Sequence, residues 1–168
     1  SGACTGATTC SVTMDTAKNV TATFTLKSAG LSVTATGNGT GTVTSSPPGI
    51  NCGADCSEPY NINTVVTLTA TPGSSSNFTS WSGCDTNPTP TTCTVTIGTN
   101  PRSVTVTFTL KIFTLTAAKS GTGGGGVTSN PAGINCGADC SEPYNAETLV
   151  TLTAAPDANS IFTGWTDG

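Results

Sequence analysis

A thirteen-residue string, GINCGADCSEPYN, occurs twice without a change, at residues 49–61 and again at residues 133–145. The same offset of 84 residues separates Trp81 from Trp165. A fixed period of this size indicates one structural unit that is used repeatedly. The chain is therefore predicted to fold as tandem copies of a unit of about 84 residues.

The repeat frame predicts where the units begin and end. Residues 1–27 match residues 82–111, so we interpret them as the C-terminal strands of a preceding or swapped unit. Residues 28–111 make one complete unit. Residues 112–168 are the N-terminal part of a following unit, which another segment equivalent to residues 1–27 would complete.

Two arrangements of the units follow from this division. The chain is expected first to be a window on a longer tandem array, since it does not begin with Met. Alternatively, residues 1–27 of one copy complete residues 112–168 of another, because unpaired strand edges attract a further strand. A head-to-tail contact of that kind does not close and generates fibres. In both arrangements the predicted partner is the same chain or an adjacent repeat, placed end to end.

Strict alternation of Thr with apolar residues predicts the secondary structure. Residues 104–110 read VTVTFTL and residues 20–26 read VTATFTL, which is typical of half-buried antiparallel strands. Similar alternation predicts strands at residues 31–36, 66–71, 113–117 and 150–154. No window shows helical periodicity, and Gly, Pro and Asn punctuate the chain into about seven short strands per unit. The predicted fold is all-β without helices, in tandem small antiparallel β-sandwich or open-barrel-like units that are stapled by disulfides.

The first hairpin of the unit is expected to differ between the two copies. Leu31 aligns with Phe113 at an offset of 82, whereas Val43 aligns with Val127 at 84. This difference predicts a turn at residues 121–126 that is longer by two residues in the second copy.

Composition limits the partners and the compartment. Only 8% of the residues are charged, the net charge is −4, and five basic residues are too few for a phosphate-binding patch, so nucleic acid is not expected as a partner. No apolar run approaches the length of a membrane span. Eight cysteines in close pairs, together with hydroxyl-rich strands, indicate an oxidising compartment, and we expect a secreted protein that is extracellular or at the cell surface.

Four cysteines per unit allow three disulfide connectivities. Five residues separate Cys4 from Cys10 and eight separate Cys84 from Cys93, while the flanking sequences stay in register. Variation inside a constant frame is typical of a loop that is stapled at its base, so these two pairs are predicted to be bonded, each around a hairpin-like loop. By elimination, the remaining predicted bonds are Cys52–Cys56 and Cys136–Cys140. A four-Cys zinc site is disfavoured because the spacing is C-x3-C and the chain has no His.

The absence of His also removes the usual nucleophilic triads and most catalytic metal sites, so we predict no enzyme activity, no catalytic residue and no cofactor. No metal site is predicted apart from one weak candidate. A weak Ca²⁺ site beside the cysteine turns is the one candidate, weighed against a solvated acidic turn. Its ligands would come from Asp55, Glu58, Asp139 and Glu142.

Four aromatic residues are candidates for contact with a glycan. Trp81 and Trp165, together with Tyr60 and Tyr144, could form a platform on which sugar rings stack. The competing interpretation is that the Trp residues belong to the core of a unit with few other large side chains. That core interpretation is favoured.

The combined motifs resemble a known family. The segments GTVTSSPPGINCGADCSEPY, TVVTLTATP, FTSWSGC, CTVTI and SVTVTFTL follow one another as in the divergent internalin-type B-repeat, also called a bacterial repeat domain. The second unit has Gly164 before its Trp, whereas the first has Ser80. Such repeats stand in tandem in large secreted or surface-attached bacterial proteins, and the resemblance supplies no catalytic residues. The resemblance implies an extracellular spacer or adhesive stalk. We therefore expect a structural segment of an extracellular bacterial fibre, stalk or surface protein, and the alternative is a glycan-binding adhesion module that uses the aromatic candidates.

Overall fold

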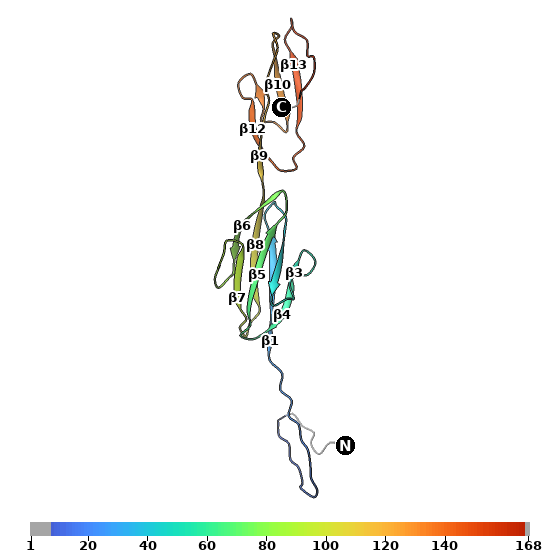
Figure 1. Ribbon diagram of the computed structural model, residues 1–168, viewed down its shortest axis with the longest axis vertical. Coiled ribbons are helices and arrows are strands. Elements are labelled where there is room, and N and C mark those ends of the chain that lie inside the picture. Colours follow the sequence, from blue (N-terminus) through green and yellow to red (C-terminus); the bar gives the residue numbers. More distant parts are fainter. Residues whose placement is uncertain (1–7, 167–168) are drawn as a thin grey trace.

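A computed structural model describes residues 8–166, which form two β-sheet units arranged end to end (Figure 1). The described residues contain thirteen strands and no helix, and hence no helical membrane span. The predicted all-β class is therefore confirmed. The first unit contains strands β1 to β8 and the second contains strands β9 to β13.

The first unit is a sandwich of two four-stranded sheets. One sheet has the order β4 (Ser57–Asn61), β1 (Ser28–Thr36), β8 (Arg102–Leu110) and β6 (Ser76–Ser82). The other has the order β3 (Asn51–Cys52), β2 (Gly41–Ser46), β5 (Val65–Pro72) and β7 (Thr92–Thr96). One core lies between the sheets, and both contribute apolar side chains to it.

The alternating sequence accounts for this core. In β8, the side chains of Val104, Val106 and Phe108 are buried, while the Thr residues between them lie on the opposite face. Successive side chains on a strand point to opposite faces, so each Thr-Val or Thr-Phe pair places one apolar side chain inside and one hydroxyl outside. β-Branched Thr also suits the pleated backbone on the solvent side.

Both lateral edges of the sandwich are closed by a disulfide. Cys52 in β3 is bonded to Cys56, which directly precedes β4 in the opposite sheet. Cys84, which follows β6, is bonded to Cys93 in β7, again in the opposite sheet. The loop between Cys84 and Cys93 is hairpin-like, as predicted, because Thr86 pairs with Thr94 in an antiparallel bridge, and it also connects the two sheets, since β6 pairs with β8 and β7 pairs with β5. The short loops are thus crossovers between sheets, and each is cross-linked.

The central pair of one sheet is parallel, although the other pairs among the described residues are antiparallel. β1 lies beside β8 from the pair Leu31–Arg102 to the pair Thr36–Thr107. These are the first and last strands of the unit. The chain therefore enters the unit at one end and leaves it at the other (Figure 1).

The second unit repeats the first part of this fold. Its strands are β9 (Ile112–Thr116), β10 (Gly125–Asn130), β11 (Asn135–Cys136), β12 (Ser141–Asn145) and β13 (Thr151–Pro156). They form a β12–β9 sheet and a β11–β10–β13 sheet around a smaller core. The disulfide Cys136–Cys140 occupies the same place as Cys52–Cys56.

The structure corrects the predicted first hairpin in two ways: β1 and β2 lie in different sheets and do not pair, and the strand register changes the alignment between the two copies. Leu31 lies opposite Glu58, and Leu115, not Phe113, lies opposite Glu142. The offset is therefore 84 along β9 as well, and the turn at residues 121–126 has not gained two residues. A shift of two residues keeps every side chain on its face of the strand, so alternation alone does not distinguish the two registers.

The strand predicted at residues 20–26 is absent. Residues 8–27 form no strand, and the Phe24 side chain is 91% exposed, whereas Phe108 at the same place in the repeat is 1% exposed. The two segments have nearly the same sequence. They differ because β8 lies between β1 and β6, whereas no strand within residues 8–166 lies beside residues 20–26 to supply backbone hydrogen bonds.

Candidate functional site

The chain passes between the two units through a single residue, Lys111. β8 ends at Leu110 and β9 begins at Ile112. The Lys111 backbone N–H donates to the Ser75 carbonyl of the first unit at 2.9 Å, and its carbonyl accepts from the Ala146 N–H of the second unit at 2.7 Å. Lys111 is thus hydrogen-bonded to both units, and no flexible linker separates them.

The Lys111 side chain adds a further contact with the first unit. Its ammonium Nζ donates to the Ser74 carbonyl at 2.6 Å. We define the junction as Lys111 together with Ser74, Ser75 and Ala146.

Half of the same junction recurs 84 residues earlier. The Ile62 N–H donates to the carbonyl of Lys27 at 2.9 Å, as the Ala146 N–H does to the carbonyl of Lys111. Lys27 directly precedes β1, as Lys111 directly precedes β9. In both units, the residue directly before the first strand is therefore held by the same hydrogen bond, from a backbone N–H of the unit to the Lys carbonyl.

Two surfaces beyond the complete sandwich carry exposed apolar side chains. In the segment before β1, Val20 and Leu26 are exposed with Phe24. In the second unit, Phe162 and Trp165 are exposed, whereas Phe78 and Trp81 at the equivalent positions of the first unit pack against the core. In the first unit, Phe78 and Trp81 lie in β6, which pairs with β8, and the second unit has no equivalent of β8 among the described residues.

The acidic residues of the cysteine turns support the backbone locally. Asp55 Oδ1 accepts from the Ser57 N–H at 3.2 Å, and Asp139 Oδ1 accepts from the Ser141 N–H at 3.2 Å. Glu58 packs beside Gly49, where a Cβ atom would meet the Glu58 Cγ at 2.5 Å. Within residues 8–166, no group of three acidic, His or Cys side chains is arranged to hold a metal ion. The calcium candidates Asp55, Glu58, Asp139 and Glu142 are therefore not assembled into a cluster.

The two candidate tyrosines are fixed by hydrogen bonds. Tyr60 is 7% exposed, and its hydroxyl shares a hydrogen bond with Ser45 Oγ at 2.7 Å and donates to the Pro47 carbonyl at 3.3 Å. Tyr144 makes the equivalent bonds with Ser129 and Pro131. The Tyr60 ring presents no open face for stacking on a sugar.

The two candidate tryptophans differ in exposure. Trp81 packs against the core of the first unit, with its ring centroid 6.0 Å from that of Phe78, and its buried Nε1–H finds no acceptor among the described residues. Trp165 is 51% exposed and lies 5.0 Å from the ring centroid of Phe162. The structure thus does not bring the four aromatic residues together on one exposed surface.

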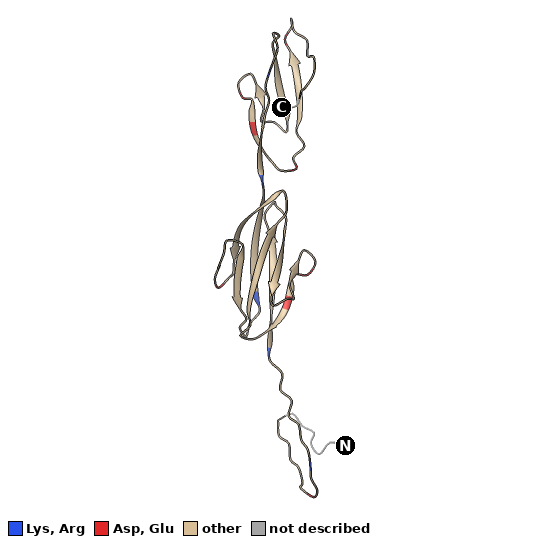
Figure 2. Cartoon of the chain, in the orientation of Figure 1, with Lys and Arg blue, Asp and Glu red and all other residues tan. Residues whose placement is uncertain are grey.

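Charged side chains are sparse over both units (Figure 2). One ion pair ties the cysteine loop to a central strand: Arg102 Nη2 of β8 donates to Asp85 Oδ1 at 2.8 Å. The Thr96 N–H donates to the other oxygen of Asp85 at 2.7 Å. These two contacts, that of Thr96 first, hold the pKa of Asp85 below its ordinary value.

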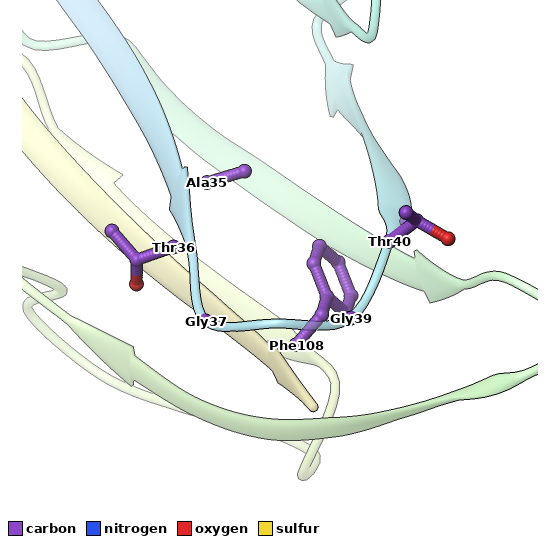
Figure 3. Close-up of a pocket in the computed structure, with 7 residues that line it drawn as sticks. Ala35, Thr36, Gly37, Gly39, Thr40 and Phe108 are labelled. Carbon is purple, nitrogen blue, oxygen red and sulfur yellow. The ribbon is translucent and has the colours of Figure 1, made fainter. Parts of the chain in front are cut away.

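A hollow of about 240 Å³ lies at the end of β8, beside the β1–β2 turn (Figure 3). Its lining carries no ionisable side chain: it is formed by Ala35, Thr36, Gly37, Gly39, Thr40, Gly41 and Phe108. Gly37 has φ of +95°, and a Cβ there would overlap the Phe108 carbonyl oxygen, so glycine lets the turn cross closely over β8. The hollow follows from this crossing and offers no catalytic group.

Sequence reasoning missed the junction and the ion pair. Lys111 was assigned only as the last residue of a unit, and no pattern in the sequence reports which carbonyl it meets. The equivalence of Lys27 and Lys111 in the repeat frame was the one signal that could have pointed to it. The predicted Cys4–Cys10 bond involves Cys4, which lies outside the described residues.

A family model described as the divergent InlB B-repeat domain matches the chain twice, over residues 31–112 and 115–168. No curated protein and no solved structure matches the chain. The two matches follow the two units, and the family is a repeat type without assigned catalysis.

Proposed function

We propose a structural role for this chain, which belongs to the divergent InlB B-repeat family. The proposed role is that of a segment of an extracellular bacterial fibre, stalk or surface protein. Its units, proposed to run from residue 28 to 111 and onward from 112, are joined end to end. The joining occurs by continuation of the chain or by strand complementation. In both modes a strand equivalent to β8 leads through a Lys residue into the first strand of the next unit.

The junction at Lys111 is the observation that carries this proposal. Lys111 is hydrogen-bonded to Ser75 on one side and to Ala146 on the other, and these contacts restrict rotation between the units. Spacers that must hold a fixed direction need such short connections, since flexible linkers coil. The half-junction at Lys27 supports the same joint for a unit that precedes β1.

The path of the chain supports an axial role. Leu31 of β1 lies beside Arg102 of the parallel strand β8. The first residue of β1, Ser28, is three residues before Leu31, and the first residue of β9, Ile112, is ten residues after Arg102, so the start of one unit and the start of the next are separated by the length of these two stretches. At roughly 3.3 Å per residue along a strand, each unit advances the chain by about 40 Å. Repetition of this step produces length in one direction.

Strand complementation is supported by matching open surfaces. Residues 20–26 carry the alternating pattern of β8, and their apolar side chains are exposed. β9 corresponds to β1, and among the described residues no strand lies on the side where β1 pairs with β8. Burying a side chain such as Phe24 stabilises a contact by about 1.5–3 kcal/mol, so docking of this segment beside β9 of a second copy is favoured.

Solution scattering and electron microscopy of the 168-residue chain test the proposal. We expect an elongated particle with unit centres about 40 Å apart. If complementation occurs, particles lengthen with concentration, and Phe24→Ala abolishes the lengthening while the matched Thr25→Ala keeps it. Compact particles in which the two units fold side by side would contradict the end-to-end function.

Glycan binding is the alternative, and the exposed Phe162–Trp165 pair is the feature that favours it. Aromatic faces of this kind can stack on sugar rings. A glycan array probed with the chain tests this function. Binding that is lost in Trp165→Ala and retained in Phe113→Ala, which alters another exposed aromatic residue of the same unit, would establish it. No binding above background would remove it.

A further inference from the structure

The two ends of the first unit are attached to two strands that lie side by side. The chain enters through β1 and leaves through β8, and these strands are parallel over the pairs from Leu31–Arg102 to Thr36–Thr107. Tension along the axis pulls the start of β1 one way and the end of β8 the other way. The strands must then slide past each other in opposite directions along their length.

Sliding loads all the backbone hydrogen bonds of the pair together. Parallel ladders have evenly spaced bonds along both strands, so none of them is free to open first. If the same strands were pulled apart from one end, the bonds would open one after another. The arrangement of the unit therefore places its six-residue parallel pairing in shear.

Side chains strengthen the same contact. Thr36 Oγ1 donates to the Val106 carbonyl at 3.2 Å and shares a hydrogen bond of 3.1 Å with Thr107 Oγ1. The turn after β1 also holds the end of β8, because Gly39 N–H donates to the Phe108 carbonyl at 3.0 Å and Leu110 N–H donates to Asn38 Oδ1 at 3.1 Å. These contacts resist displacement of β8 relative to β1.

The core shields this pair from water on one face. Leu31 and Val33 of β1 are buried against the core, as are Val104, Val106 and Phe108 of β8. The disulfides Cys52–Cys56 and Cys84–Cys93 close the lateral edges, but neither connects β1 to β8. The β1–β8 contact is consequently the one that must break before the unit lengthens.

We propose that β1 and β8 form a shear clamp that makes the unit resist tension between its two ends. Its use in a stalk rests on the proposed function, since tension reaches the clamp through the junction at Lys111. The resistance itself is a property of one unit. It can be measured whether or not units assemble into fibres.

Single-molecule force spectroscopy of the full chain tests the clamp. In the shear geometry the chain is tethered at its two termini. In the peeling geometry it is tethered at its C-terminus and at residue 40, through a clickable amino acid in place of the exposed Thr40, which follows the β1–β2 turn. Residue 40 and the end of β8 lie at the same end of the pair, so this tether opens the ladder bond by bond.

The expected result is an unfolding force severalfold higher in shear than in peeling, because forced unfolding reports the barrier along the pulled direction. The Thr40 variant tethered at both termini is the matched control and should keep the high force. Equal forces in the two geometries would overturn the clamp. Such a result would leave the end-to-end spacing measured by scattering unaffected, so the two proposals fail separately.

Discussion

Phe108 and Phe24 occupy the same place in the repeat and provide a matched pair of perturbations. Phe108 is among the largest fully buried side chains, and its ring lies 6.5 Å from that of Phe78 in an edge-on contact. Phe24 is exposed and lies in a segment without strands. The same substitution to Ala should therefore have very different effects at the two positions.

The expected magnitude follows from burial. Replacing a core Phe by Ala costs about 3–5 kcal/mol, since transfer energy is lost and a cavity remains beside Gly41, which the Phe108 ring contacts. With a guanidinium slope of about 2 kcal/mol/M, a loss of 4 kcal/mol lowers the unfolding midpoint by about 2 M. Phe24→Ala removes no packed contact within the chain, so its effect should stay within about 0.5 kcal/mol.

Chemical denaturation followed by Trp fluorescence measures both effects. A Trp165→Phe background leaves Trp81 as the reporter, because these are the two Trp residues of the chain. Phe108→Leu, which keeps most of the volume, should lose only about 1 kcal/mol and guards against a variant that does not fold. Equal losses for Phe24→Ala and Phe108→Ala at low protein concentration would refute the assignment of residues 20–26 as an unpaired segment.

Two further predictions concern the cross-linked loop between β6 and β7. The Thr96 N–H and then Arg102 lower the pKa of Asp85 below 3.8, so the stability it contributes is present above that value and is lost as the pH falls through the folded-state pKa. Urea midpoints measured from about pH 5 down to about pH 2 should therefore fall less steeply in Asp85→Asn than in the unmodified chain, and parallel profiles would contradict the role of Asp85. Replacing Cys84 and Cys93 by Ala should cost about 3 kcal/mol, against about 2 kcal/mol for the same change at Cys52 and Cys56, because the bridged separations are 9 and 4 residues. Thermal unfolding of the two double variants checks the order, and a larger loss for the shorter loop would count against it.

The strands with uninterrupted alternation were the predictable part of the fold. The pattern of residues 104–110 identified a half-buried strand because its period matches the pleat, and β8 confirms it. The identical logic failed at residues 20–26, since alternation reports the ability to form a strand but not the presence of a neighbour. Whether a strand finds a neighbouring strand depends on the tertiary structure, and this difference leaves Phe24 exposed while Phe108 is buried.

The arrangement of the strands was not predictable from local patterns. Nothing in the sequence of β1 or β8 favours a parallel neighbour over an antiparallel one, because both carry the same alternation. The register of β9 was also ambiguous by two residues, which leaves its faces unchanged. Likewise, cysteine spacing indicates a short closed loop, but it does not reveal that the loop between Cys84 and Cys93 crosses between sheets.

The central claim is that the two units are joined rigidly, end to end, through Lys111. Pulsed spin-label distances between Thr69 and Thr153 measure this joint, since these exposed positions lie 84 residues apart at the same place in β5 and β13. Labels attached through unnatural amino acids leave the cysteines untouched. We predict a single narrow distribution near the axial step of about 40 Å, which broadens when a Gly-Ser linker is inserted after Lys111. A distribution that is already broad without the insertion would contradict the claim.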